Sequence, residues 1–518
     1  MRNRRQRYDQ AMLLRTIVIC LLLIVSAPHA IAAGYSDAAG IAWFKGDVNA
    51  AFAEAQKQHK PVLLYWGAVW CPPCQQLKST VFNRPDFIAR TTLFVPVYLD
   101  GDDEGAQKWG EVFGAAGYPT LLILDANKHE LQRIAGGMDL NQYANVLDLA
   151  LADAQPVTAI LDAAVKHHAI TASQCKRLAL NGWVLDDVDE AALKQRTAQL
   201  DSAAQQCPKD SLVDRTRLQI IAAYYATHAD KATLNRHIDT VMHVLNQPSL
   251  AQQVVDALWY FDDDFFKAVK ARGAAKSQRF VKNFTAVMEA AAHDNRFAEA
   301  DQLTSVASEL QANKILSATG TIAPNMAQAA RARLDVALGK HSTPYVRSGL
   351  INAGLAIYDL LGQNEEAYRM VKAELSNSST PYYYKADLAD LAESLGRNDE
   401  AIDWLAQAYN ESKGTATRAQ WGVRYVSGLL RLKPDDTGRI RDVSMQVLSE
   451  LDGNDRIYRR ARTSLTRLDV ALRAWNDKSS GAHHEVLAAL HSRLQKTCVR
   501  IPANEPARQS CDAFLAKN

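Results

Sequence analysis

The stretch Trp70-Cys71-Pro72-Pro73-Cys74 decides the fold of its part of the chain. It follows an apolar run at residues 62–66 and precedes a helix-compatible run that begins at Gln75. A strand that ends in a Cys-x-x-Cys and turns into a helix places the first sulfur at a helix N-terminus. Free N–H groups and the helix dipole there favour a thiolate over a thiol. The two prolines suit the first helical turn, where a missing N–H costs little.

This spacing has two interpretations, a redox-active dithiol and half of a zinc site. In a dithiol, the Cys71 thiolate attacks a disulfide and Cys74, one turn later, resolves the mixed disulfide. We therefore expect Cys71 to be the accessible nucleophile. A zinc site needs two further ligands, but no second Cys-x-x-Cys or Cys-x-x-His exists and the next cysteine is Cys175. The pattern favours redox chemistry, with no metal and no cofactor besides the Cys71–Cys74 disulfide.

Strand and helix signals alternate between residues 40 and 150. Apolar, β-rich runs predict strands, and apolar residues at helical spacing predict helices. The strands are expected at 61–67, 93–100, 121–125 and 131–134, and the helices at 47–60, 75–80, 86–89, 105–113 and 139–149.

This pattern resembles the thioredoxin family over about a quarter of the chain. The resemblance rests on the Cys-x-x-Cys motif, on Lys60-Pro61-Val62-Leu63-Leu64 and on Gly117-Tyr118-Pro119-Thr120 before a strand. Within the family it is most similar to the periplasmic branch typified by the C-terminal domain of the bacterial thiol:disulfide interchange reductase. The resemblance implies an α/β thioredoxin fold, a central mixed sheet flanked by helices, at residues 38–153.

The resemblance also implies roles for single residues. Cys71 is the attacking cysteine and Cys74 the resolving one. Pro119 is the family's cis-proline, which packs across from the disulfide, and Tyr118 offers backbone groups to the substrate chain. Trp70 is expected to contact the substrate as well. The substrates are then protein disulfides, and a membrane electron donor re-reduces the site.

Two positions depart from the family pattern. Many thioredoxins place a buried Asp six residues before the first cysteine and an acid two residues before it, where this chain has Tyr65 and Val69. A nearby carboxylate raises the pKa of a thiol, so we expect the Cys71 thiolate to form more easily here. We expect Tyr65 to pack in the core, as aromatic strand residues usually do.

The N-terminal residues 1–33 have the layout of a secretory signal peptide. Arginines precede an apolar run at residues 16–27, and Ala30-Ile31-Ala32-Ala33 supplies small residues at cleavage spacing. The run is shorter than the roughly 20 residues that span a bilayer. We expect a periplasmic protein. The alternative is an uncleaved inner-membrane anchor that faces the periplasm.

Six of the seven cysteines lie outside this segment, and Cys20 lies within it. An even number in an exported chain suits an oxidising compartment. Sequence proximity favours the pairs Cys71–Cys74, Cys175–Cys207 and Cys498–Cys511. The two outer pairs are expected to be structural disulfides.

Residues 157–518 have helical periodicity and few glycines or prolines. Leu361-Gly362-Gln363-Asn364-Glu365-Glu366-Ala367 recurs 34 residues later, from Leu361 to Leu395, as Leu395-Gly396-Arg397-Asn398-Asp399-Glu400-Ala401. This is the period of tetratricopeptide repeats. We predict an all-α solenoid of tetratricopeptide-like units, clearest at residues 347–414, whose concave face binds protein partners.

Two aromatic triplets in this region have two interpretations. Tyr382-Tyr383-Tyr384 and Trp259-Tyr260-Phe261 could line a peptide groove, although core packing is the more usual role of helical aromatic residues.

The sequence therefore predicts a periplasmic thiol–disulfide oxidoreductase whose helical repeats select or hold its protein partner. A net charge of +2 argues against nucleic acid as that partner. One alternative is a disulfide oxidase or isomerase of the same fold, because the sequence does not fix the direction of electron flow. The other is a non-catalytic scaffold or adaptor in which the helical repeats do the binding.

Overall fold

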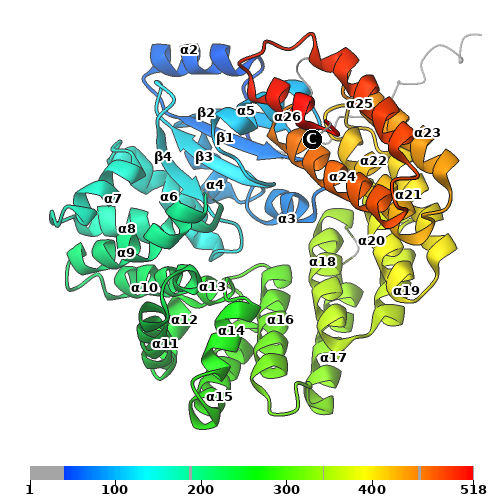
Figure 1. Ribbon diagram of the computed structural model, residues 1–518. Coiled ribbons are helices and arrows are strands. Elements are labelled where there is room, and N and C mark those ends of the chain that lie inside the picture. The colour runs from blue at the N-terminus through cyan, green and yellow to red at the C-terminus, as the bar shows by residue number, and fades with distance from the viewer. Residues whose placement is uncertain (1–39, 186–188, 342, 453–456, 517–518) are drawn as a thin grey trace, which may run out of the picture. The chain divides into compact units, whose positions relative to one another are not determined.

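The computed structural model describes residues 40–185, 189–341, 343–452 and 457–516. They belong to one compact unit, Ala38–Asn518. The predicted signal peptide lies outside the described residues. Among the described residues, the strands all lie before residue 135, and helices make up the regular structure that follows (Figure 1).

The first part of this unit is an α/β region whose elements end within a few residues of their predicted ends. Its strands are β1 (Val62–Gly67), β2 (Val95–Asp100), β3 (Thr120–Leu124) and β4 (Glu130–Ile134). Its helices are α2 (Val48–Gln58), α3 (Pro72–Thr80), α4 (Pro85–Thr91), α5 (Glu104–Val112) and α6 (Leu140–Ala152).

The four strands form one mixed sheet in the order β2-β1-β3-β4. Strand β1 pairs in parallel with β2 and antiparallel with β3, and β3 pairs antiparallel with β4. Because alternate side chains of a strand face opposite sides, Leu63 and Tyr65 pack toward α3, α4 and α6. Val62, Leu64 and Trp66 pack toward α2 and α5. Helices therefore cover both faces of the sheet.

The second part is a succession of helices that starts at Val157. These helices are α7 (Val157–Val165), α8 (Ala172–Leu180), α9 (Glu190–Gln206), α10 (Leu212–Tyr225), α11 (Lys231–Leu245), α12 (Pro248–Gln253), α13 (Val255–Leu258), α14 (Asp263–Lys270), α15 (Ala274–Ala291), α16 (Glu299–Leu316), α17 (Pro324–Lys340), α18 (Pro344–Leu361), α19 (Asn364–Glu374), α20 (Pro381–Ser394), α21 (Asn398–Glu411), α22 (Arg418–Leu432), α23 (Thr437–Ser449), α24 (Arg459–Lys478), α25 (His484–Cys498) and α26 (Pro506–Ala513).

The start of this helical region covers the outer edge of β4. The buried guanidinium of Arg177, on α8, donates hydrogen bonds to the backbone oxygens of Leu131 and of Asp153, the latter at 2.8 Å. Asn181 forms a β-bridge with Ile134. An exposed sheet edge is a template for aggregation, and here the helical region pairs with that edge directly.

The sequence repeat falls on two helix–turn–helix units. Gly362 ends α18 in the left-handed conformation, with φ of 66°, and Gly396 lies between α20 and α21 with φ of 74°. Such φ values favour glycine. Ala367 and Ala401, at the equivalent positions of α19 and α21, are both buried. The helices therefore pack as the repeat predicts, and the assignment to tetratricopeptide repeats stays a prediction.

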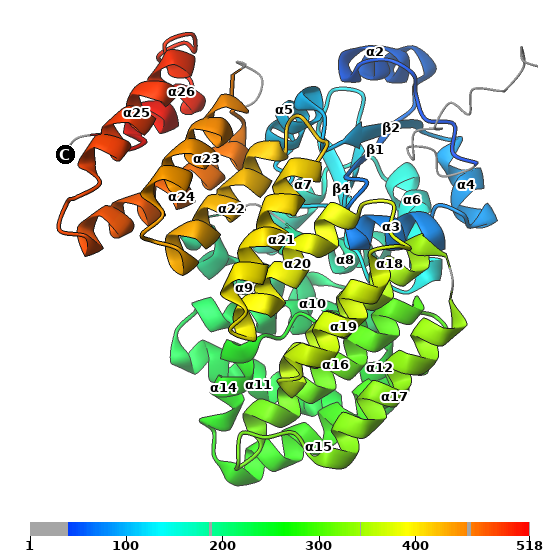
Figure 2. The same ribbon diagram turned by 90° about the vertical axis from the view of Figure 1, so that its right-hand side faces the viewer.

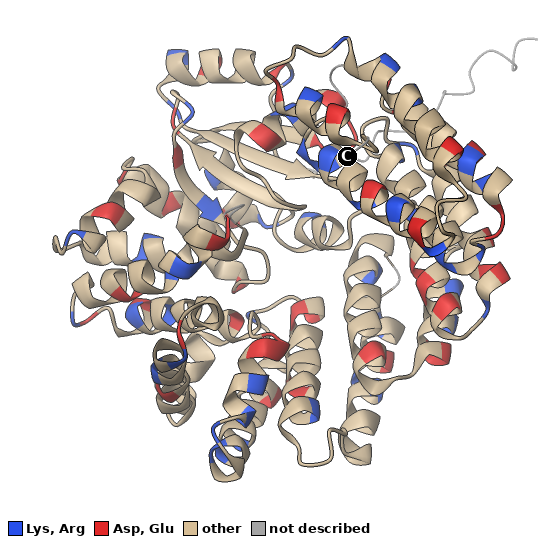
Figure 3. Ribbon diagram, in the orientation of Figure 1, with Lys and Arg blue, Asp and Glu red and all other residues tan. Residues whose placement is uncertain are grey.

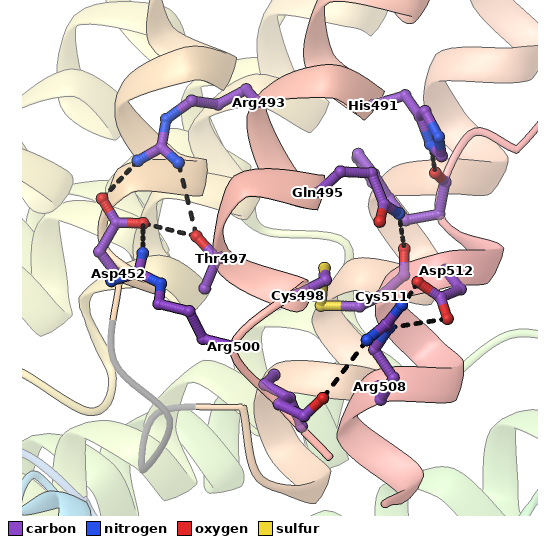
Figure 4. Close-up of a disulfide and its surroundings, with 12 residues drawn as sticks. Asp452, His491, Arg493, Gln495, Thr497, Cys498, Arg500, Arg508, Cys511 and Asp512 are labelled. Atoms are coloured by element: carbon purple, nitrogen blue, oxygen red, sulfur yellow. Dashed lines mark hydrogen bonds and ion pairs between the residues drawn. A yellow bond between two sulfur atoms is a disulfide. The ribbon is translucent and has the colours of Figure 1, made fainter. Parts of the chain in front are cut away.

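The outer cysteines form two disulfides within the helical region. Cys175 on α8 is joined to Cys207 at the end of α9, and Cys498 at the end of α25 is joined to Cys511 on α26. Figure 4 shows the second bond, beside which the Gln495 side chain donates a hydrogen bond to the Cys511 backbone oxygen at 3.2 Å. Each bond ties a helix to the helix that follows it.

Charged residues of both signs are interspersed along the helices (Figure 3). Within the described ranges, no helix combines the length and the apolar character needed to cross a membrane. The ion pair between α10 and α13 is buried: Arg217 donates two hydrogen bonds to the carboxylate of Asp256, at 2.6 and 2.7 Å. The Nε of Arg217 also donates a hydrogen bond to the backbone oxygen of Ala179.

Replacing Asp256 by Asn should lower the free energy of unfolding by about 3 kcal/mol, because it leaves a buried guanidinium without its counter-charge. Urea denaturation followed by tryptophan fluorescence measures this change. The double variant Asp256→Leu, Arg217→Met serves as the control and should regain most of the loss, since it buries no charge. An unchanged urea midpoint for Asp256→Asn would contradict the structural role of the pair.

Candidate redox site

The Cys-x-x-Cys motif lies at the start of α3, directly after the loop that follows β1. Cys71 is the N-cap residue, and Pro72 and Pro73 are the first two residues of the helix. The backbone N–H of Cys74 donates a hydrogen bond to the Cys71 sulfur at 3.4 Å. No disulfide joins the two cysteines in this structure. The first sulfur therefore occupies the helix N-terminus, where N–H donors favour a thiolate.

The loop before β3 lies beside the motif. Its Tyr118–Pro119 peptide bond is cis, as the resemblance implies. The Tyr118 ring meets the Trp70 ring edge-on, with centroids 5.6 Å apart. Trp70 and Tyr118 both pack against the buried cluster that contains Cys71 and Cys74. The fold thus brings together all five residues that the sequence assigns to catalysis and substrate binding.

Tyr65 lies in the core beneath the motif. Its ring stacks on Tyr98 at 5.2 Å and meets Phe82 edge-on at 4.9 Å. The prediction of a core position is confirmed, since Tyr65 is fully buried. Burial, together with the nearby Cys74 thiol, holds the pKa of Tyr65 well above its usual value. Tyr65 therefore stays a phenol and cannot accept a proton as a buried carboxylate does.

Comparison with known proteins agrees with this geometry. Residues 48–151, from α2 to α6, match the family model of the thioredoxin-like domain. The protein contains a thioredoxin-like domain. The predicted fold class is confirmed: a thioredoxin-like domain with a mixed sheet flanked by helices, followed by a long all-helical region. Among curated proteins, the comparison finds no relative of this chain.

The helical region packs directly onto Trp70 of the thioredoxin-like domain. The Trp70 ring stacks on Tyr383 of α20, with centroids 5.8 Å apart and planes 20° apart. It also meets Trp421 of α22 edge-on at 5.4 Å. Together with Tyr118, these residues form what we call the Trp70 cluster. Figure 2 shows α3 close to α18.

A polar contact fixes the loop before α22 beside this cluster. The carboxylate of Asp102, in the loop after β2, accepts hydrogen bonds from Trp70 Nε1 at 2.9 Å and from Thr417 Oγ1 at 2.6 Å. Its backbone oxygen accepts the N–H of Ala416 at 3.1 Å. Gly414 lies so close that a Cβ atom there would collide with the Asp102 side chain. Burial raises the pKa of Asp102 above its usual value despite its two hydrogen bonds.

Further contacts join α5 and α3 to the helical region. The carboxylate of Glu111 on α5 accepts two hydrogen bonds from the Arg462 guanidinium of α24, both at 3.0 Å. Burial alone would raise the pKa of Glu111, but Arg462 lowers it below its usual value. On α3, Gln76 donates a hydrogen bond to Asp301 of α16 at 2.7 Å. Gly349 of α18 lies against the Gln76 side chain, where a Cβ atom would come within 3.1 Å.

Both cysteines are buried, with Trp70 and Tyr118 packed against them. Cys71 is 4% exposed and Cys74 is fully buried. Burial raises the pKa of the Cys71 thiol well above its usual value, and the adjacent Cys74 adds to this rise. The expectation of an accessible Cys71 is therefore wrong for this conformation. The expectation that the missing carboxylates ease thiolate formation stays a prediction, because the effect of burial adds to theirs.

Sequence reasoning missed the helical residues that complete the site. Thr417, Trp421 and Asp301 carry no motif, and they lie more than 200 residues from the cysteines in sequence. The two aromatic triplets are the sequence feature that could have indicated helical residues at this site. Tyr383 contacts Trp70, whereas Phe261 is a core residue. Within the described ranges, no group of three or more His, Cys, Asp or Glu side chains is arranged to hold a metal ion.

The substitution Gly414→Ala should loosen the cover over Cys71, because its Cβ displaces Asp102 and with it the bond to Trp70. We expect iodoacetamide to alkylate Cys71 about tenfold faster, which corresponds to about 1.4 kcal/mol in the opening equilibrium. Peptide mapping of the reduced protein measures the rate at each cysteine.

Gly438→Ala is the matched control. Gly438 lies in α23 with no neighbouring atom within 4 Å of its Cβ position. The alkylation rate of Cys71 in this variant should therefore equal that in the unmodified protein. Equal rates for both variants would mean that the loop before α22 does not restrict access to Cys71.

Proposed function

We propose that this protein is a thiol–disulfide oxidoreductase in which Cys71 attacks and Cys74 resolves. The observation that carries the proposal is the Cys71 sulfur at the N-terminus of α3, which accepts the Cys74 N–H beside the cis-Pro119 loop. A sulfur in this position is stabilised as a thiolate whenever it is hydrated enough to lose its proton.

In the reducing direction, the Cys71 thiolate attacks one sulfur of a substrate disulfide. The substrate S–S bond breaks, a mixed disulfide forms on Cys71, and the first substrate thiolate takes up a proton. Cys74 then loses its proton and attacks the Cys71 sulfur, which releases the second substrate thiolate. Two electrons pass to the substrate and the Cys71–Cys74 disulfide forms. A dithiol donor must reduce that disulfide again, and we propose a membrane protein for this role.

The helical region controls access to this chemistry in the proposal. A protein disulfide cannot approach a sulfur that is 4% exposed, so the Trp70 cluster must open before Cys71 attacks. Opening also hydrates the thiol, which lowers the pKa that burial raises. Binding of a substrate to the helical region would supply the free energy for this opening.

Export to an oxidising compartment, the periplasm, fits the same proposal. The disulfides Cys175–Cys207 and Cys498–Cys511 support it, because such bonds persist in oxidising compartments. Reduction, oxidation and isomerisation use the same two sulfurs and differ in the reduction potential of the pair.

The burial of the dithiol favours a second candidate function. A protein whose cysteines stay covered could act as an adaptor, with the helical surface as its working part and the thioredoxin-like domain as a structural support. In that case the cysteines would not be needed for binding partners.

Replacing Cys74 by Ser should trap substrates, because the mixed disulfide on Cys71 then lacks its resolving sulfur. Diagonal electrophoresis of extracts should show adducts of this protein that a reductant releases. The unmodified protein should reduce insulin disulfides with a dithiol donor, whereas Cys71→Ser should be inactive.

The double variant Cys71→Ser, Cys74→Ser is the matched control and should form no adducts. If Cys74→Ser forms no more adducts than this control, the exchange mechanism does not apply. Non-covalent partners that the double variant still retains at full level would then support the adaptor function.

A further inference from the structure

A cavity of about 400 Å³ lies between the thioredoxin-like domain and the helical region. On one side it is lined by Pro73 and Gln76 of α3 and by the cis-Pro119 loop. On the other side it is lined by Trp259 and Asp301, and further residues of both regions complete the wall. This volume suits a side chain or a small molecule. Cys71 does not line it, so the cavity can hold the part of a substrate next to its disulfide.

The cavity wall carries one carboxylate without a counter-charge. Asp301 accepts the hydrogen bond from Gln76, and among the described residues it forms no ion pair. Asp256 also lines the cavity, but Arg217 neutralises it with two hydrogen bonds. Burial raises the pKa of Asp301 to about 7. A cation in the cavity would remove this cost, because an opposite charge favours the ionised carboxylate.

Aromatic side chains lie beside this carboxylate. The Trp259 indole N–H donates to Ser305 Oγ at 3.0 Å, which fixes the ring. Tyr143 and Tyr260 line the same cavity, and both lie close enough for the charge of Asp301 to raise their pKa further beyond the effect of burial. Ring faces attract cations electrostatically. A carboxylate among three aromatic rings therefore forms a site that favours an ammonium or guanidinium group.

A glycine keeps this space open. A Cβ atom at Gly137 would lie 3.6 Å from the Asp301 carboxylate and 3.6 Å from the Trp259 ring. The residue has φ of 74°, which glycine adopts readily. The carboxylate and the indole thus border the same gap, and no side chain of the thioredoxin-like domain fills it at this point.

The gap lies within reach of the reacting sulfur. Gln76, the hydrogen-bond partner of Asp301, follows Cys71 by five residues (71 to 76) on α3. At 1.5 Å of rise per residue this is roughly 7–8 Å along the helix. An extended lysine or arginine side chain is about as long, so a basic residue next to a substrate cysteine can place its charge at Asp301.

We infer that the cavity binds a lysine or arginine side chain that neighbours the target cysteine of the substrate, with Asp301 as its counter-charge. The inference rests on the proposed oxidoreductase function and deepens it, because it assigns a preference for disulfides with basic neighbours. Asp301 acts here as a specificity-determining residue of the helical region.

Three synthetic peptide disulfides test this inference. They are symmetric dimers of one short sequence with Lys, Gln or Glu placed two residues after the cysteine. For the full-length protein, we expect kcat/KM for the Lys peptide to exceed that for the Glu peptide at least about tenfold, a difference of about 1.4 kcal/mol. In Asp301→Asn this ratio should fall to about one, since Asn can still accept the hydrogen bond from Gln76 but carries no charge.

Asp264→Asn is the matched control. It removes the same charge from an exposed position on α14, and its Lys-to-Glu ratio should equal that of the unmodified sequence. A ratio that falls equally in both variants would assign the preference to net charge and overturn the inference. The inference is also overturned if the Lys-to-Glu ratio stays high in Asp301→Asn. The same holds if this ratio is about 1 in the unmodified protein.

Two further measurements test which ligands the cavity accepts and separate binding from disulfide reduction. Cystamine, a small diamine disulfide, tests whether the cavity takes free amines: dependence on Asp301 with cystamine extends the site to small molecules, and dependence with peptides alone restricts it to side chains. Calorimetry of the reduced Lys peptide with the Cys71→Ser, Cys74→Ser protein measures binding without chemistry. Binding that Asp301→Asn abolishes supports the cavity site even if no peptide is reduced, a result that would reject the oxidoreductase function alone.

Discussion

The packing of Trp70 against Tyr383 and Trp421 joins the helical region to a residue that covers the dithiol. The start of α3 favours a thiolate through its N–H donors, whereas burial under the Trp70 cluster favours the neutral thiol. In this conformation burial has the larger effect, since the pKa of Cys71 is raised. The surroundings of the dithiol are therefore formed by contacts with the helical region as well as by the motif itself.

This contact constrains the path of the helical region. The region starts at the β4 edge, where Arg177 binds the backbone of the sheet. It then returns to the opposite side of the domain, where Arg462 of α24 binds Glu111 of α5. Between these two anchors, α16 and α18 lie against α3, through Asp301 and Gly349. The helical region thus contacts the thioredoxin-like domain at the β4 edge of the sheet, at α3 and at α5.

Local patterns explain why so much of the α/β region could be predicted. The Cys-x-x-Cys motif and the alternation of apolar residues act over a few positions, so they place α3 and the four strands correctly. The prediction of a cis bond before Pro119 rests on the family resemblance and not on a local pattern. The burial of Cys71 could not be predicted, because Thr417 binds Asp102 across 315 residues of sequence. Nothing in the residues around position 417 indicates this partner. The sequence alone does not show which residues of the two regions come into contact.

The same contacts change how the two regions divide their work. The sequence indicates a catalytic module followed by a separate binding module, so that a chain ending near residue 155 would keep the whole site. In the structure, such a chain would leave Trp70 without Tyr383 and Trp421, and the cavity beside Pro119 would lose the wall that holds Asp301. It would also expose the backbone of β4 that Arg177 covers. The helical region is therefore part of the surroundings of the Cys71–Cys74 dithiol. In the proposed function, substrate selection and thiol reactivity are for this reason not assigned to separate regions of the chain.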